Sequence, residues 1–192
     1  MMNVTRDSNG VETSRDTSVQ LVLQTSAHLN GQTDAIEMVE TTRGSMRPPD
    51  TNYFRFASNG DMQLSLGGQT QGVLAGWITL PFASHTPQSF SFDTTTDLVL
   101  FTESTHGTFS SSYLHDENIT AKSVSLACQV VSFGYDVTTS SSITGTSVSS
   151  SVTQLSLAPS IGWIVHSKDL QNTTDGGRGD LSESTLIDYS LK

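Results

Sequence analysis

Apolar and polar residues alternate with a period of two along much of this chain, and this pattern constrains its fold more than any other feature. Phe54 and Phe56 flank Arg55, and Met62 and Leu64 are separated by one glutamine. Successive side chains of a β-strand point to opposite faces of a sheet, so this spacing gives each segment one apolar face. The same pattern recurs in further segments and predicts an all-β fold.

The polar positions are filled mainly by hydroxyl side chains. Serine and threonine supply about 56 of the 192 residues, whereas charged residues make up only 15%. Threonine favours strands, and serine favours turns because its hydroxyl competes for backbone hydrogen bonds. We therefore expect an antiparallel β-sandwich of about eight strands with little helix. Residues 33–42 are the one segment for which we expect a short helix.

Two local features of this sandwich can be predicted. Asn59 and Gly60 lie between alternating segments, and an Asn-Gly pair in that setting predicts a β-hairpin. Between Val130 and Val131 the apolar positions change from even to odd numbers. One extra residue in a strand has this effect, so we expect a β-bulge at this step.

The two ends of the chain are more polar than its middle. We expect residues 1–17 to form a polar N-terminal arm, residues 18–167 the β-sandwich domain, and residues 168–192 a polar C-terminal segment. Segments of this composition become ordered only when something holds them. We expect neighbouring subunits of an oligomer, a fibre or a shell to do so.

Charge and composition argue against several classes of function. The chain has 9 basic and 19 acidic residues, and its basic residues do not cluster, so we expect no direct binding of nucleic acid. The longest apolar runs are about 11 residues, against the ~20 that a membrane-spanning helix needs. No apolar segment follows the first charged residues, so we expect no secretory signal. The single cysteine, Cys128, excludes an internal disulfide and predicts a buried structural thiol.

One segment resembles a known family. Residues 127–139 read ACQVVSFGYDVTT, and Gly145 follows after a short loop. This segment resembles one of the eight jelly-roll strands in coat proteins of small non-enveloped icosahedral RNA viruses. The resemblance covers about 25 residues and implies a jelly-roll sandwich that assembles with copies of itself or with other capsid proteins in a virion. The basic arm that such coats use to hold RNA has no counterpart here, and only about 45 residues follow the matching strand. The resemblance then implies a minor, truncated or cleaved shell component, or a genome that is held elsewhere.

A candidate receptor-binding motif lies near the C-terminus. Arg178, Gly179 and Asp180 form the tripeptide that integrins recognise on viral and matrix proteins, and Leu181 follows it as in some integrin ligands. An integrin can pair the arginine with a carboxylate and bind the aspartate through a metal ion. Flanking glycines favour a projecting loop, although the same tripeptide arises by chance in polar loops. This motif predicts attachment to a host integrin.

No pattern of catalytic or metal-binding residues stands out. The five histidines are isolated, and neither a metalloprotease helix motif nor a nucleophile elbow occurs, so we expect no catalytic residues, no metal site and no cofactor. Three interpretations of function remain. The first is a non-enzymatic structural virion protein, which would also attach the particle to a cell if the Arg-Gly-Asp loop projects outward. The second is a receptor- or carbohydrate-binding β-module such as a fibre head or lectin-like domain, and the third is a small hydrolase on a β scaffold.

Overall fold

The computed structural model describes residues 1–29, 31–42, 50–65, 77–98 and 101–189, and this part of the chain contains strands and turns but no helix. Thirteen strands in these described ranges form one sheet, and all of the pairs between them are antiparallel. The all-β class is thus confirmed, but the expected number of about eight strands was too low. The strands are β1 (Met2–Arg6), β2 (Glu12–Leu29), β3 (Gln32–Thr42), β4 (Asp50–Phe56), β5 (Met62–Ser65), β6 (Trp77–Leu80), β7 (Gln88–Leu98), β8 (Phe101–Ala121), β9 (Val124–Ser141), β10 (Gly145–Ala158), β11 (Trp163–Thr174), β12 (Gly177–Arg178) and β13 (Leu181–Thr185).

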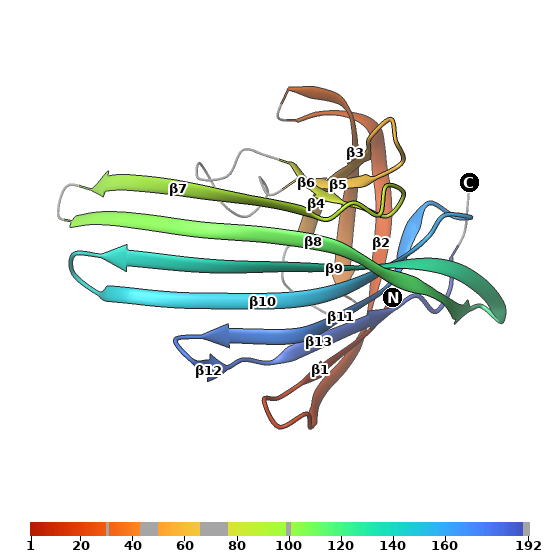
Figure 1. Ribbon diagram of the computed structural model, residues 1–192. Helices are drawn as coiled ribbons and strands as arrows, with labels where there is room; N and C mark the ends of the chain where they lie inside the picture. The colour runs from red at the N-terminus through yellow and green to blue at the C-terminus, as the bar shows by residue number, and fades with distance from the viewer. Residues whose placement is uncertain (30, 43–49, 66–76, 99–100, 190–192) are drawn as a thin grey trace.

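Most strands pair with their neighbours in sequence. The order across the sheet is β6, β5, β4, β3, β2, β1, β13, β11, β10, β9, β8 and β7, with β12 beside β11 (Figure 1). A jelly roll instead needs Greek-key connections, which place strands distant in sequence side by side. In the described sheet only β1 and β13 form such a distant pair. The jelly-roll sandwich is therefore not confirmed.

The two polar ends of the chain lie side by side in this sheet. Strand β1 pairs with β13 from Met2 opposite Thr185 to Arg6 opposite Leu181. The amino group of Met1 also donates a hydrogen bond to the carbonyl oxygen of Ser18, at 2.9 Å. Both ends are thus held within one chain, which supplies the support that we expected from neighbouring subunits. Strands β1, β12 and β13, and most of β11, come from the segments 1–17 and 168–192.

The largest apolar cluster, called the main core, lies between the two halves of the curled sheet. Strand β6 contacts β8, and Ser111 Oγ donates to the carbonyl oxygen of Thr79 at 2.6 Å. Burial of the apolar faces of both halves drives this closure. The main core contains Phe54, Met62, Ile78, Leu80, Phe82, Phe109, Val131, Leu155 and Leu157.

A second cluster, called the small core, explains why the apolar positions change parity along β9. Leu126 and Cys128 belong to the small core, whereas Val131 belongs to the main core and Phe133 packs against it. Even and odd residues of one strand lie on opposite faces, so β9 buries one face near its start and the other further along. The small core contains Met1, Ala121, Leu126, Cys128, Ala158, Val165 and Leu186.

The β-bulge that we predicted lies at the expected level of the sheet but in the neighbouring strand. Tyr113 pairs with Val131 and His115 pairs with Val130, so Leu114 of β8 is the extra residue. The register of β9 with β10 shows no shift at this level. Placing the bulge in β9 itself was therefore wrong, because the parity change marks a change of buried face.

The predicted hairpin is confirmed and the predicted helix is wrong. Strands β4 and β5 pair on either side of a turn in which Gly60 has a positive φ of 88°. Residues 33–42 belong to strand β3. Ile36 and Met38 of that strand both pack against the main core, and their spacing of two residues suits a strand.

Candidate functional site

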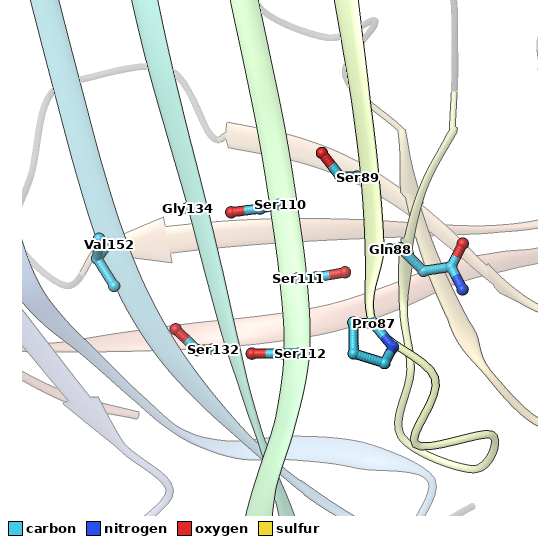
Figure 2. Close-up of a pocket in the computed structure, with 9 residues that line it drawn as sticks. All are labelled: Pro87, Gln88, Ser89, Ser110, Ser111, Ser112, Ser132, Gly134 and Val152. Carbon is cyan, nitrogen blue, oxygen red and sulfur yellow. The ribbon is translucent and has the colours of Figure 1, made fainter.

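A shallow hollow lies on the face of the sheet that points away from the main core. It has a volume of about 320 Å³ and is crossed by strands β7 to β10. Ser89, Ser110, Gly134 and Val152 form one row across these four strands. Because Gly134 has no side chain, the floor of the hollow is open at this point (Figure 2). The lining residues are Pro87, Gln88, Ser89, Ser110, Ser111, Ser112, Ser132, Gly134 and Val152.

The chemistry of this hollow is neutral and polar. Figure 2 shows Ser111 pointing to the opposite side of β8 from Ser110 and Ser112. The hydroxyls of Ser110, Ser112, Ser132 and Ser89 have no hydrogen-bond partner among the described residues. The lining includes no acidic, basic, histidine or cysteine side chain. The hollow therefore offers hydrogen bonds to an uncharged ligand, and no lining group is suited to general acid or base catalysis.

A second feature is the part of strands β7 to β10 around residues 94–95, 104–105, 139–140 and 146–147, which we call the wing. Figure 1 shows these four long strands extending beyond β4, β5 and β6. Two rows of hydroxyl residues cross the wing back to back. One row contains Thr94, Thr105, Thr139 and Ser147, and the other contains Thr95, Ser104, Ser140 and Thr146.

The hydroxyl groups of the wing bond to one another across the strands. Thr105 Oγ1 lies 3.3 Å from Thr139 Oγ1 on one face, and Ser140 Oγ lies 3.2 Å from Thr146 Oγ1 on the other. A sheet normally buries at least one apolar face against another layer. At these rows neither face is apolar, so burial of apolar surface does not stabilise this part of the sheet.

The Arg-Gly-Asp motif lies beside β11. The tip of the β11–β12 hairpin is formed by Asp175 and Gly176, which both have positive φ, and the motif follows this tip. Asn172 makes two hydrogen bonds to the backbone of the motif. Its carbonyl oxygen accepts from the Gly179 amide at 2.8 Å, and its Nδ2 donates to the Asp180 carbonyl at 3.1 Å.

The side chains of the motif remain accessible despite this backbone tether. Arg178 and Asp180 are exposed, and Leu181 begins β13 and is half-buried. Of the glycines before the motif, Gly176 lies at the hairpin tip and Gly177 begins β12. Binding to an integrin through Arg178, Gly179, Asp180 and Leu181 stays a prediction.

Other polar side chains form separate pairs. His106 Nδ1 lies 2.7 Å from Asp93 Oδ1 at the surface, and His166 Nε2 lies 3.1 Å from a carboxylate oxygen of Glu183. Ser156 Oγ donates to a carboxylate, Glu117 Oε1, at 2.6 Å. A serine nucleophile would need a basic partner such as histidine, so this pair does not resemble a catalytic triad.

Cysteine and metal chemistry have little support in the described part of the chain. Cys128 is 2% exposed, and burial raises the pKa of its thiol, which keeps the thiol neutral. No group of three or more histidine, cysteine or acidic side chains suited to a metal ion occurs among these residues. They also include no helix that is long and apolar enough to cross a membrane.

Comparisons of the chain with protein-family models, curated proteins and solved structures gave no match. Two parts of that surface were not predicted from the sequence, namely the hollow and the paired hydroxyl rows of the wing. The abundance of serine and threonine was the signal for both, but only strand register brings residues such as Ser110 and Gly134 together.

Proposed function

We propose that this chain is a non-enzymatic structural protein that assembles with copies of itself or with other shell proteins in a virion. One observation carries the proposal: the wing presents hydroxyl side chains on both of its faces. Neighbouring molecules that cover these two rows bury little charge there and gain hydrogen bonds with their serine and threonine hydroxyls. A surface of this kind therefore costs less to desolvate than a charged one.

The viral part of the proposal rests on the resemblance of residues 127–139 to a coat-protein strand. These residues lie in β9, where Val131 belongs to the main core and Thr139 to one of the wing rows. The proposal does not depend on jelly-roll connectivity, which the strand order lacks. It depends on the uncovered wing.

Light scattering after size-exclusion chromatography tests this proposal. The native chain should form oligomers or particles as its concentration rises. Thr146→Lys places a charge on the wing and should reduce the assembled fraction at least tenfold. Thr13→Lys is a matched control, because both threonines are exposed strand residues with one side-chain hydrogen bond each. A clean monomer at every concentration would overturn the proposal, and so would equal losses in the two variants.

The hollow supports a second candidate, a carbohydrate-binding module. Its free serine hydroxyls and neutral lining suit the hydroxyl groups of a sugar. A methyl group added at Gly134 would lie 3.2 Å from the carbonyl oxygen of Ser151 and would partly fill the floor. Titration with neutral oligosaccharides, followed by NMR, should shift signals of the lining residues in the native chain, with smaller shifts in Gly134→Ala. An absence of shifts in the native chain would exclude this candidate.

A further inference from the structure

Strand β7 forms a long free edge of the sheet. The sheet order ends at β6 and β7, and β6 has 4 residues whereas β7 has 11. Among the described strands, β7 pairs only with β8, so one row of its backbone groups lacks a strand partner. Unpaired backbone groups on an edge are a template for another strand.

The sequence of this edge lacks the devices that usually protect such a strand. Proteins block edges with lysine, proline, bulges or very short strands. Strand β7 reads QSFSFDTTTDL, with no lysine or proline, and its register with β8 has no shift. Its acidic residues are Asp93 and Asp97, and the carboxylate of Asp93 disfavours some pairings of the edge and permits others.

A row of aromatic rings ends at the same edge. Phe133 stacks on Phe109 at 6.1 Å, and Phe109 stacks on Phe90 of β7 at 5.0 Å. Phe92 also contacts Phe109, at 5.7 Å. Phe90 is 38% exposed, so the row of rings stops at solvent with an apolar surface uncovered. An incoming strand with aromatic residues at matching positions would continue the row.

We propose that β7 of a second copy of this chain adds to this edge, antiparallel and centred on Ser91. This inference rests on the proposed assembly function and names the edge through which copies join. Centring on Ser91 sets Phe90 of each copy opposite Phe92 of the other, which continues the aromatic row on one face. It also sets each Asp93 opposite Ser89 of the other copy.

Other centres of the same pairing are less favourable. A centre at Asp93 would set the two Asp93 carboxylates directly opposite each other, and like charges in that position destabilise a sheet. A centre at Phe92 would set Phe90 opposite Thr94 and keep only one pair of opposed rings. The edge is therefore self-complementary in the register centred on Ser91, and for this reason we assign a second copy as its occupant.

The contact is small and should act together with others. Centring on Ser91 pairs only residues 88–94 of the two copies. We expect this pairing to bury less than the total of about 1,000 Å² that a stable interface needs. The chain also carries a net charge of −10, so two copies repel each other at low ionic strength. Association through this edge should therefore increase with salt and with concentration.

Disulfide trapping tests the pairing and its register. Opposed residues of antiparallel strands have Cα atoms about 4.5–5.5 Å apart, within the range of a disulfide. Ser91→Cys, on an exposed position, should give a covalent dimer under mild oxidation, at least tenfold more than the native chain with its buried Cys128. Ser89→Cys is the register control, because residue 89 would face residue 93 of the other copy and should give no excess dimer. Ser110→Cys, on the same face one strand further in, should also give none.

The outcomes separate this inference from the proposed function. If Ser91→Cys folds, as shown by circular dichroism, and gives no excess dimer while the native chain assembles, the edge pairing is wrong and the assembly proposal stands. If Ser91→Cys gives a dimer but the native chain forms nothing larger, the edge pairing is correct and the shell proposal is wrong. Equal trapping of Ser91→Cys and Ser89→Cys would overturn the register. Phe90→Asp in the Ser91→Cys chain should remove the trapped dimer, and an unchanged yield would overturn the aromatic argument.

Discussion

Asp61 offers a direct test of how the β4–β5 hairpin is joined to the rest of the fold. Its side chain is 2% exposed although it is a carboxylate. Oδ1 accepts hydrogen bonds from the backbone amides of Ala83 and Ser84, at 2.9 and 2.8 Å, and Oδ2 accepts from Asn59 Nδ2 at 2.8 Å. Asp61 thus ties the hairpin turn to the segment between β6 and β7. We predict that loss of the Asp61 carboxylate lowers the free energy of unfolding of the chain.

The expected magnitude follows from these three hydrogen bonds. A hydrogen bond to a charged group contributes about 1.5–3 kcal/mol, and a buried donor that loses its partner incurs a desolvation cost. Ala83 and Ser84 are exposed, so water can replace part of what they lose. We therefore expect Asp61→Ala to lower the free energy of unfolding by about 2–4 kcal/mol. Asp61→Asn keeps the volume and one acceptor oxygen and should cost about 1–2 kcal/mol.

The pH dependence of this contribution has a definite sign. Burial by itself raises the pKa of Asp61, but hydrogen bonds from Ser84, Ala83 and Asn59 outweigh it and hold the pKa below the ordinary value of 3.8. A carboxyl group with a lowered folded-state pKa stabilises the fold above its unfolded-state pKa. This contribution should begin to decrease as the pH falls below 3.8 and should be lost below the folded-state pKa.

Urea unfolding followed by tryptophan fluorescence, at pH 7 and at pH 3, measures both effects. The native chain should lose stability between these pH values by more than Asp61→Asn does. Asp93→Asn is a control, because that carboxylate side chain is 82% exposed and should change stability by less than about 0.5 kcal/mol. If Asp61→Ala unfolds within about 0.5 kcal/mol of the native chain at pH 7, the hairpin is not held by this carboxylate.

Three further changes test other parts of the structure. Gly107→Ala would place a methyl group in steric conflict with the ring of Phe92, so we expect a loss of about 1–2 kcal/mol in urea unfolding. Unchanged stability would refute the close approach of Gly107 and this ring. Trp163→Phe removes the hydrogen bond from Nε1 to Gln20 Oε1, at 2.9 Å, and should cost about 1 kcal/mol by thermal or urea unfolding; a stability equal to that of the native chain would mean that this bond contributes nothing net. Asp180→Glu should abolish attachment to integrin-bearing cells if the exposed motif is used, and unchanged attachment would exclude that use.

The sequence predicted local features well where neighbouring residues decide them. The hairpin at Asn59 and Gly60 forms as expected, because a turn depends on a few adjacent residues and their allowed dihedral angles. The segment 33–42, in which Ile36, Met38 and Val39 lie among acidic residues, was expected to form a short helix but belongs to strand β3. Ile36 and Met38 carried the correct signal, since residues two apart share one face of a strand.

For the candidate site, the sequence showed which residues are present but did not predict how they are arranged in space. The Arg-Gly-Asp motif was visible as a string, but its position beside β11 depends on hydrogen bonds to Asn172. The hollow and the wing rows join residues from four strands, and the free edge of β7 exists only because no described strand pairs with it. No spacing within one segment predicts such a neighbourhood.

By itself, the sequence determined that this chain forms strands, that hydroxyl side chains occupy most of their polar positions, and that its basic residues do not cluster. Only the tertiary structure decided which strands are neighbours, which face of β9 is buried at each level, and that β1 pairs with β13. The physical reason is that alternation sets the two faces of each strand, whereas backbone hydrogen bonds between strands are nearly the same for every sequence. The choice among pairings is made by the apolar burial of the whole sheet, which is a property of the complete fold.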